Sequence, residues 1–368
     1  MHLTLCLTEN CTLRCAYCYA GSKRAVAMSR DTVLAALDFG LGNMAPDATQ
    51  FVVGFFGGEP LMEWNLLRWA HKQAQEKAAA KDVKAAFTLT TNLTLLDQEK
   101  ADWLLAEDYH IGMSLDGHAV AHDAIRVYPN GNGSHADCVR AMRLLTGRGA
   151  SGKIINVVHP RNVAMLAASV EWLASEYGFE IALNPDFTAQ WNTAALAELS
   201  DQYARVGEFY VARFRSGRPV RVSTIDSKIL SHTNSGFDDC KKCRMGDREF
   251  AVSVHGELYP CSRLVGSKAP ALRMGDVWQG FDLATFSRLL ARRGNDNPAC
   301  AECPVARRCM NRCACVNHMD SGDIGRVGGF TCFHEKLAIE TADRCAGILW
   351  YERNPAFVKR FFTHKPTV

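Results

Sequence analysis

Short apolar runs alternate with longer amphipathic stretches along the first half of the chain. The runs are largely apolar and several are rich in β-branched residues, which is typical of parallel strands covered on both faces. The stretches between them repeat their apolar positions at helical spacing. This pattern predicts strands at His2–Leu7, Gln50–Phe56, Ala85–Thr90, His110–Leu115, Lys153–Val158 and Phe179–Leu183. It predicts helices at 29–43, 62–80, 97–107, 134–148, 163–177 and 193–215.

The ends of several predicted helices carry residues that suit them. Ser29, Asp97 and Ser134 stand where N-caps belong, and Gly149 follows the fourth helix as a stop signal. Six βα units joined by right-handed crossovers predict an α/β fold, a partial (β/α)6 barrel of the TIM type. Functional side chains are then expected at the carboxyl ends of the strands.

Beyond the last predicted helix the sequence changes character. The stretch Ser216–Gly236 is polar and rich in turn residues, and Phe250–Val254 and Glu257–Tyr259 flank a His255-Gly256 hairpin signal. We therefore divide the chain into a barrel at 1–215, a linker at 216–239, a cysteine-rich domain at 240–335, and a C-terminal helix and tail at 336–368.

Composition narrows the classes of function. A net charge of +3, from 42 basic and 39 acidic side chains, provides no electrostatic basis for binding nucleic acid or an anionic membrane. No signal peptide or membrane-spanning run is evident, so we expect a cytoplasmic protein. Disulfides are rare in that compartment, and metal ligation becomes the default explanation for the 15 cysteines.

Three cysteines follow the first predicted strand closely, in the run Cys11-Thr-Leu-Arg-Cys15-Ala-Tyr17-Cys18. Iron–sulfur clusters bound only by protein and structural zinc sites take four ligands, so a loop with three leaves one metal position open. The alternative for this motif alone is half of a zinc site.

A second motif, Gly57-Gly58-Glu59-Pro60, follows the second predicted strand. Paired glycines at a strand end let the backbone approach a ligand closely, and we expect the Glu carboxylate and neighbouring carbonyls to face a cation. Taken alone, the motif is equally compatible with an ordinary turn between a strand and a helix.

Together the two motifs resemble the signature of the radical S-adenosylmethionine (SAM) superfamily. The resemblance implies that Cys11, Cys15 and Cys18 hold a [4Fe–4S] cluster whose fourth iron binds SAM. Gly57 to Pro60 would then receive the SAM amino group. The remaining residues that the resemblance places near SAM or the substrate are Tyr17, Asn92, Ser114, Asp116 and Arg126. Leu93 departs from the Gly that the family has after Thr-Asn, which leaves the geometry of that turn open.

The last third of the chain carries a separate cysteine pattern. Cys243 is followed by Gly256 and Cys261, and Cys300-x2-Cys303-x5-Cys309-x3-Cys313 precedes Cys332. This resembles the SPASM extension of radical SAM enzymes that modify peptides and proteins. Zinc is the rival metal, because Cys-x2-Cys pairs are common in zinc sites.

With Cys240 these cysteines number eight, enough for two auxiliary [4Fe–4S] clusters. The resemblance assigns Cys240, Cys243, Cys261 and Cys313 to one cluster and Cys300, Cys303, Cys309 and Cys332 to the other. The protein would therefore hold three clusters. Four cysteines remain as small buried hydrophobic residues, among which Cys315 could exchange with Cys313: Cys6, Cys138, Cys315 and Cys345.

The resemblance implies a maturase that oxidatively crosslinks a ribosomally made peptide, through a thioether or carbon–carbon bond. An anaerobic sulfatase-maturing enzyme is the first alternative, although such enzymes commonly have an Asp after the Tyr-Pro-Cys segment, where this chain has Ser262. A zinc-binding interaction module is the alternative from another class. Expected partners are a precursor peptide, an electron donor of flavodoxin or ferredoxin type, and a separate leader-binding protein if the barrel and the 185–240 insertion do not recognise the peptide. The sequence leaves open the modified residue, the bond formed, the catalytic base and the oligomeric state.

Overall fold

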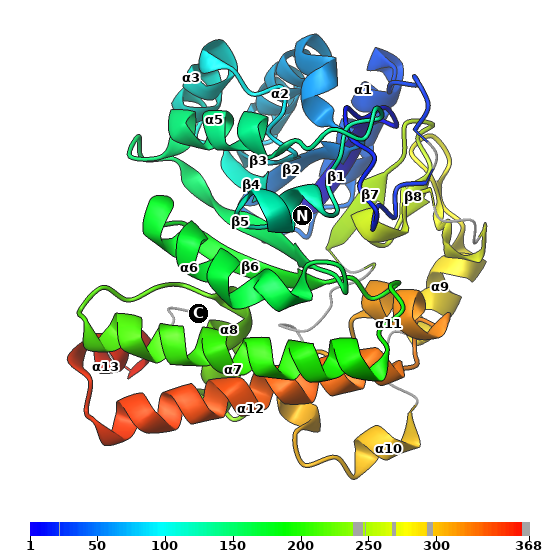
Figure 1. Cartoon of the computed structure of the whole chain (residues 1–368). Coiled ribbons are helices and arrows are strands. Elements are labelled where there is room, and N and C mark those ends of the chain that lie inside the picture. Colours follow the sequence, from blue (N-terminus) through cyan, green and yellow to red (C-terminus); the bar gives the residue numbers. More distant parts are fainter. Residues whose placement is uncertain (22, 238–245, 247, 267–269, 293–296, 363–368) are drawn as a thin grey trace. The chain divides into compact units, whose positions relative to one another are not determined.

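The computed structural model describes residues 1–21, 23–237, 246, 248–266, 270–292 and 297–362 (Figure 1). Its strands are β1 (His2–Thr8), β2 (Gln50–Gly57), β3 (Lys84–Thr91), β4 (His110–Ser114), β5 (Ser151–Val158), β6 (Glu180–Pro185), β7 (Glu249–Val252), β8 (Leu258–Tyr259), β9 (Gly275–Asp276) and β10 (Gly280–Phe281). Its α-helices are α1 (Arg30–Gly42), α2 (Trp64–Ala79), α3 (Gln98–Ala106), α4 (Ala119–Asp123), α5 (His135–Leu145), α6 (Leu166–Glu176), α7 (Thr193–Arg215), α8 (Ser223–Thr233), α9 (Leu283–Ala291), α10 (Pro298–Ala301), α11 (Ala314–Ser321), α12 (Gly329–Tyr351) and α13 (Pro355–Phe362).

The elements form two compact units. The first comprises residues 1–114, 126–152 and 244–294, and the second comprises residues 115–125, 153–243 and 295–368. Each unit combines segments that are distant in sequence, whereas the sequence suggested consecutive domains. The domain boundaries expected from the sequence stay a prediction.

All six predicted barrel strands are present, each within two residues of its expected ends. The helix at 193–215 has the predicted bounds, whereas α2 and α6 each begin after a short 3-10 turn. Ser29 and Asp97 cap their helices through side-chain hydrogen bonds, as predicted. Ser134 lies at the N-cap of α5 but makes no capping bond, and its hydroxyl instead donates to the Arg126 carbonyl at 2.9 Å.

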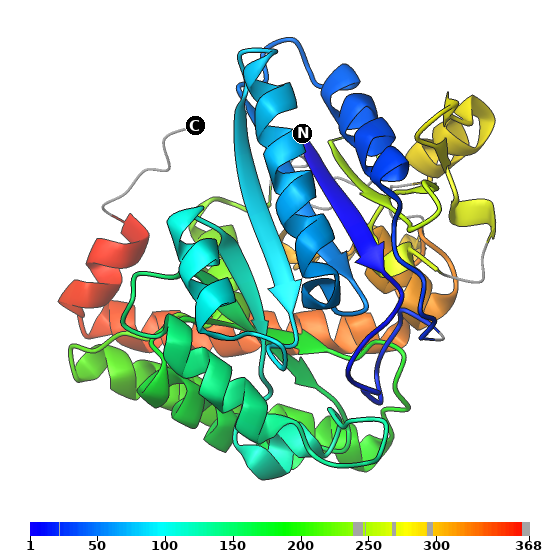
Figure 2. The same cartoon turned by 90° about the horizontal axis from the view of Figure 1, so that it is seen from above.

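In the first unit, strands β4, β3, β2 and β1 lie side by side and run parallel. Helices α1 and α2 contact each other and cover one face of these strands (Figures 1 and 2). Strand β1 is buried along its length from Leu3 to Thr8. Burial on both faces explains why the strands are continuous apolar runs rather than alternating ones.

Strand β7 extends this sheet, which the sequence did not predict. It pairs with β1 in parallel, with Leu3 opposite Phe250 and Leu5 opposite Val252. The predicted hairpin then returns as β8, antiparallel to β7. The segment Glu249–Tyr259, which we expected in a separate cysteine-rich domain, therefore belongs to the same unit as the three-cysteine loop.

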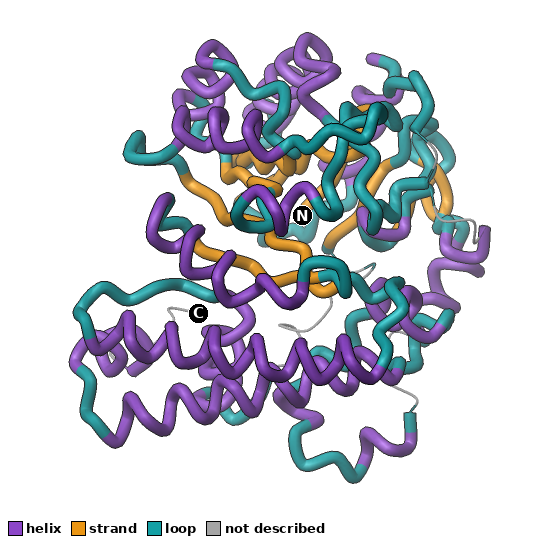
Figure 3. Tube along the Cα trace, viewed as in Figure 1, coloured by secondary structure: helices purple, strands orange, loops and turns teal. Residues whose placement is uncertain are grey.

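In the second unit, β5 and β6 pair in parallel, and the long helices α7 and α12 lie alongside each other (Figure 3). Tyr203 in the middle of α7 hydrogen-bonds His334 near the start of α12, and Arg215 at the end of α7 forms an ion pair with Glu352 just after α12, so the two helices run in the same direction.

The segment predicted as a linker contains helix α8. Its buried residues Ile225 and Ile229 are spaced four apart on one face, and the helix contacts β6 and α12. Asp226 accepts a hydrogen bond from the Tyr210 hydroxyl at 2.6 Å. The prediction of a linker at 216–239 therefore missed a packed helix, because the segment is polar in composition. Throughout the described ranges, every helix is too short or too polar to cross a bilayer.

Candidate active site

The loop that carries the first three cysteines begins with side-chain hydrogen bonds at the end of β1. Thr8 Oγ1 accepts from the Asn10 amide at 3.2 Å and donates to the Val26 carbonyl, and Asn10 Oδ1 accepts from the Cys11 amide at 2.9 Å. These bonds turn the chain out of the strand. The Cys18 amide donates to the Cys15 carbonyl. The cysteine loop therefore starts at the carboxyl end of β1, where the sequence placed it.

Donors that lie close in sequence reach the sulfur atoms of this loop. The Leu13 amide lies 3.4 Å from Cys11 Sγ, and Lys23 Nζ lies 2.9 Å from Cys18 Sγ. Burial is the main cause that raises the pKa of the Cys11 thiol to about 11, so the thiol is protonated until a metal displaces the proton. Donors directed at sulfur suit thiolates bound to a metal.

Backbone contacts join the second motif to the cysteine loop. Gly58 N donates to the Thr8 carbonyl and Glu59 N donates to the Asn10 carbonyl, both at 2.8 Å. A Cβ atom on Gly58 would lie 1.9 Å from the Asn10 carbonyl oxygen. Gly57 has a φ of +125°, which L side chains rarely adopt. The two glycines are thus required by the close approach of these backbones.

Glu59 differs from expectation, because its carboxylate does not face outward. The residue is fully buried, and Oε1 accepts from the Leu61 amide at 3.0 Å and the Thr91 hydroxyl at 2.8 Å. Oε2 accepts from the Asn92 amide at 2.7 Å. The carboxylate therefore ties the end of β2 to the end of β3 and is not exposed as expected, and binding of SAM by Glu59 stays a prediction.

The buried position of Glu59 predicts a pH effect on stability. Burial outweighs the three hydrogen bonds and raises the Glu59 pKa from 4.5 to about 7. Because the folded state binds this proton more tightly than the unfolded state, the contribution is present below pH 4.5 and is lost as pH rises toward 7. We expect Glu59→Gln to remove a decline of up to about 3 kcal/mol in the free energy of unfolding across this range.

The measurement is urea unfolding of the metal-free protein at several pH values. Glu99→Gln on the exposed side of α3 serves as the matched control and should retain the wild-type decline. Parallel pH profiles for wild type and Glu59→Gln would contradict the prediction.

Asn92 connects the end of β3 to the cysteine loop. Its Nδ2 lies 3.5 Å from Cys11 Sγ and 3.1 Å from Thr12 Oγ1. The next residue, Leu93, adopts a φ of +71° although it is not glycine. A left-handed conformation destabilises a residue other than glycine by about 1–2 kcal/mol. Burial of the Leu93 side chain offsets this loss of stability.

Arg126 also joins this set. Its guanidinium carbon lies 5.0 Å from the centroid of the Tyr17 ring, within cation–π distance. The Arg14 amide donates to the Val127 carbonyl at 2.7 Å, so the segment that carries Arg126 lies against the cysteine loop. Tyr17, Gly57–Pro60, Asn92 and Arg126 thus lie around the cysteine loop within one unit.

Ser114 and Asp116 lie at the end of β4 but fall in different units. Ser114 is buried at the last position of the strand. In the second unit, Asp116 Oδ1 accepts from the Val157 amide at 2.7 Å, and the Asp116 amide donates to His122 Nδ1. One Asp116 oxygen is therefore engaged with β5. Contact of either residue with SAM stays a prediction.

A cavity of about 140 Å³ lies beside the Gly57-Gly58 turn. Its walls come from the end of β1, the cysteine loop around Tyr19, the β7–β8 turn and the segment after Cys261. The sequence did not point to His255 and Glu257, which both line it. The only feature of the sequence that marks these two residues is the polar turn between two apolar strands.

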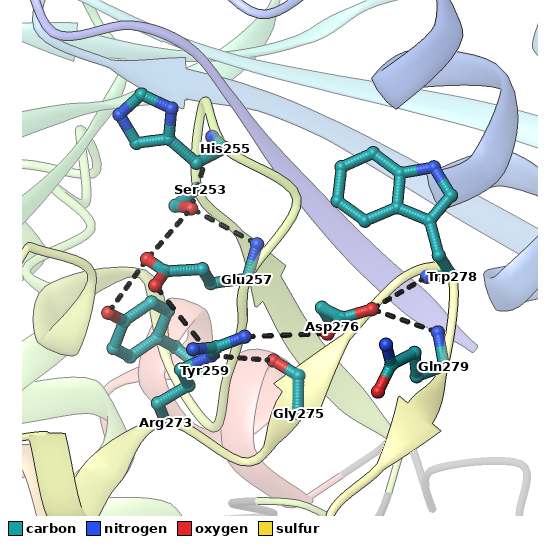
Figure 4. A network of polar contacts seen from close by, with 9 residues as sticks. All are labelled: Ser253, His255, Glu257, Tyr259, Arg273, Gly275, Asp276, Trp278 and Gln279. Atoms are coloured by element: carbon teal, nitrogen blue, oxygen red, sulfur yellow. Dashed lines mark hydrogen bonds and ion pairs between the residues drawn. The ribbon is translucent and has the colours of Figure 1, made fainter.

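Glu257 is held in place by its neighbours (Figure 4). Its Oε2 accepts from Ser253 Oγ at 3.3 Å and from the Tyr259 hydroxyl at 3.2 Å, and its Oε1 lies 3.6 Å from Arg273 Nε. His255 is exposed at the turn, and its ring points away from this network (Figure 4). The cavity therefore contains a carboxylate of fixed position and an accessible imidazole, either of which can accept a proton.

The C-terminal cysteines are divided between the units. Cys261 follows β8 in the first unit, and Cys300, Cys303, Cys309, Cys313 and Cys332 lie in the second. Cys313 Sγ lies 3.7 Å from the buried Cys315 Sγ, so these two remain exchangeable as ligands. Cys240 and Cys243 lie outside the described residues.

Within the described ranges, no three Cys, His, Asp or Glu side chains lie close enough together to hold a metal ion. The donor chemistry nevertheless suits thiolate-bound metals. Among the described residues, buried Thr331 Oγ1 and His334 Nδ1 lack partners, and they lie on either side of Cys332 in sequence. Unpaired buried polar atoms of this kind are rare in folded proteins, and they are compatible with a group that is bound there.

Comparison with known proteins identifies the class. The sequence model of the Radical SAM superfamily matches residues 5–173, which include the cysteine loop and the Gly57–Pro60 turn. This part of the chain is thus a radical SAM domain, and the class inferred from the two motifs is confirmed, as is the α/β fold with a parallel sheet.

Two curated relatives illustrate the sequence similarity. An uncharacterized protein of Archaeoglobus fulgidus is 26% identical over 91% of this chain and 79% of its own length. The cysteine-type anaerobic sulfatase-maturating enzyme of Clostridium perfringens is 24% identical over 73% of this chain and 75% of its own length.

Two solved structures share the fold. Native anSMEcpe with bound AdoMet matches with a TM-score of 0.78 at 18% identity, covering 95% of this chain and 99% of that one. Streptococcus suis SuiB bound to its precursor peptide SuiA matches with a TM-score of 0.58 at 14% identity, covering 90% of this chain and 75% of that one.

Proposed function

We propose that the protein is a radical SAM peptide maturase that crosslinks a ribosomally made precursor peptide by removing hydrogen. The observation that carries the proposal is the contact between the two motifs, in which Gly58 and Glu59 donate to the carbonyls that lead into the cysteine loop. The solved structure of SuiB with its precursor peptide supports a peptide as substrate, because the fold is shared over 90% of the chain.

Within this proposal the cysteine loop would hold a [4Fe–4S] cluster that binds SAM, with Cys11, Cys15 and Cys18 as ligands. Bound and reduced, these cofactors supply a 5′-deoxyadenosyl radical that can take a hydrogen atom from an unactivated carbon. The protein's own residues position the reactants and exclude water. Buried Glu59 fixes the turn after β3, and its neighbour Asn92 reaches toward Cys11.

Arg126 and the Gly57-Gly58 turn would bind the two charged groups of the SAM methionine. Arg126 presents a fixed positive charge over Tyr17, which suits a carboxylate. Backbone carbonyls at the glycine turn suit an ammonium group, because no side chain blocks their approach. Glu257 and His255, which line the adjoining cavity, are the candidate bases for the proton that leaves the substrate.

The C-terminal cysteines would hold two auxiliary clusters, as the SPASM resemblance implies. Cys240, Cys243, Cys261 and Cys313 would bind one, and Cys300, Cys303, Cys309 and Cys332 the other. A flavodoxin- or ferredoxin-type donor would supply the electron, and a separate protein would bind the leader if the barrel does not. This proposal includes a cytoplasmic location.

The expected product is a precursor peptide that is lighter by two hydrogens after anaerobic co-expression. One hydrogen atom would leave with the deoxyadenosyl radical; the remaining proton would go to a base and the remaining electron to a cluster held by the C-terminal cysteines. Tandem mass spectrometry should show a crosslink that prevents fragmentation between the joined residues. A product of unchanged mass would contradict the proposal and indicate epimerisation.

Sulfatase maturation is the second candidate, supported by the similarity to the Clostridium perfringens enzyme. Oxidation of Ser to formylglycine also removes two hydrogens, so mass alone does not separate the two reactions. An aldehyde-reactive hydrazide does, because it labels formylglycine and leaves a crosslink unlabelled. Labelling of a sulfatase peptide, with no crosslink in a precursor peptide, would favour this second candidate over the first.

A further inference from the structure

Lys228 on α8 and Glu335 on α12 form a buried ion pair in the second unit. Lys228 Nζ lies 2.6 Å from Glu335 Oε2, and the exposed fractions of the two side chains are 3% and 11%. Buried ion pairs are seldom the most stabilising choice, because removing both charges from water offsets much of their attraction. We therefore looked for a role of this ion pair other than stabilising the fold.

The pair binds the backbone on both sides of one cysteine. Lys228 Nζ donates to the carbonyl of Arg308 at 3.2 Å, and Glu335 Oε2 accepts from the amide of Met310 at 2.6 Å. The residue between these two contacts is Cys309. Lys228 and Glu335 thus hold the backbone on both sides of Cys309 and place two opposite charges beside this residue.

Neighbouring contacts hold the same segment. The Arg308 guanidinium donates to both Asp343 carboxylate oxygens, at 2.8 and 2.6 Å, and to the Lys228 carbonyl at 3.1 Å. The Arg307 carbonyl accepts from the Phe237 amide at 2.9 Å. The segment before α11, which includes the short 3-10 turn Ala306–Arg308, is therefore held against α8 and α12 by charged groups.

We propose that Lys228 and Glu335 are positioning residues for a metal site that includes Cys309, and that their charges tune its reduction potential. This inference rests on the proposed auxiliary cluster. A positive charge beside a four-thiolate cluster favours the reduced form, which is more negative, and a negative charge disfavours it. Lys228 and Glu335 should therefore act in opposite directions.

The test is a redox titration of the reconstituted enzyme, followed by electron paramagnetic resonance, without SAM or peptide. We expect Glu335→Gln to raise the potential of one auxiliary cluster and Lys228→Met to lower it, with the remaining clusters unchanged. The double variant should lie between the two single variants. Glu352→Gln, which alters an exposed ion pair on the same helix, is the matched control and should leave every potential unchanged.

If Lys228→Met fails to fold because Glu335 is left unpaired, Glu335→Gln and the double variant decide the question. Shifts of both variants in the same direction, or full iron content with unchanged potentials, would overturn the inference. A wild-type protein with iron only at the barrel cysteines would overturn it too. Absence of peptide modification, by contrast, would refute the proposed function while leaving this measurement valid.

Discussion

Replacing Cys11, Cys15 and Cys18 together by Ala will reduce the formation of 5′-deoxyadenosine from SAM to that of a reaction without enzyme. The three thiols are the ligands of the proposed SAM-binding cluster, and Asn92 and Lys23 reach toward two of them. Without these thiolates there is no iron to which SAM can bind. The measurement is anaerobic incubation with SAM and dithionite, followed by chromatography.

Iron content provides the internal check on this variant. We expect about twelve irons per chain in the reconstituted wild type and about eight in the triple variant, because the C-terminal ligands remain. Cys345→Ala removes a buried thiol that donates to the Gly207 carbonyl and is the matched control, with wild-type iron and activity expected. Undiminished SAM cleavage in the triple variant would refute the assignment. Stoichiometric zinc at the C-terminal cysteines would refute the auxiliary clusters alone.

Substituting Gly58 by Ala will disrupt the same site without removing any ligand. The added Cβ would lie 1.9 Å from the Asn10 carbonyl oxygen, and no side-chain rotation can relieve a clash with backbone. The hydrogen bonds from Gly58 and Glu59 to the cysteine loop would break, each contributing about 1 kcal/mol. With the strain, we expect a loss of about 3 kcal/mol in the free energy of unfolding and at least a tenfold loss in SAM affinity.

Gly42→Ala is the matched control for this substitution. Gly42 ends helix α1, and a Cβ atom there would meet nothing within 4 Å. Ala is the better helix former, so this variant should be as stable as wild type or slightly more stable. Calorimetry for SAM binding and urea unfolding for stability measure both effects. Wild-type SAM affinity in Gly58→Ala would show that the backbone contact is dispensable.

Several features of the site were predictable because they depend on residues close in sequence. The spacing of Cys11, Cys15 and Cys18 and the order Gly57-Gly58-Glu59-Pro60 identify the superfamily without any structure. The helix at 193–215 likewise depends on local periodicity, and its bounds agree with α7. The linker prediction missed α8, because polar residues that the fold buries, among them Asp226, Lys228 and Ser231, surround Ile225 and Ile229 and hide the apolar spacing.

Other features depend on partners that are distant in the chain. Glu59 was expected to face a cation, but its buried carboxylate accepts hydrogen bonds from Leu61, Thr91 and Asn92. Leu93 adopts a backbone conformation that its residue type disfavours, because the packed surroundings of the strand end impose it. Neither outcome has a local sequence signal.

The sequence by itself determined the class of chemistry, because thiol number, spacing and the glycine pair are properties of short segments. It also determined the order of strands and helices, through apolar periodicity. Only the tertiary structure decided that β7 joins β1, that Glu257 lines a cavity beside Gly57, and that Lys228 and Glu335 enclose Cys309. These contacts join residues far apart in the chain, and their energies depend on burial and on neighbouring charges, which no local pattern of residues records.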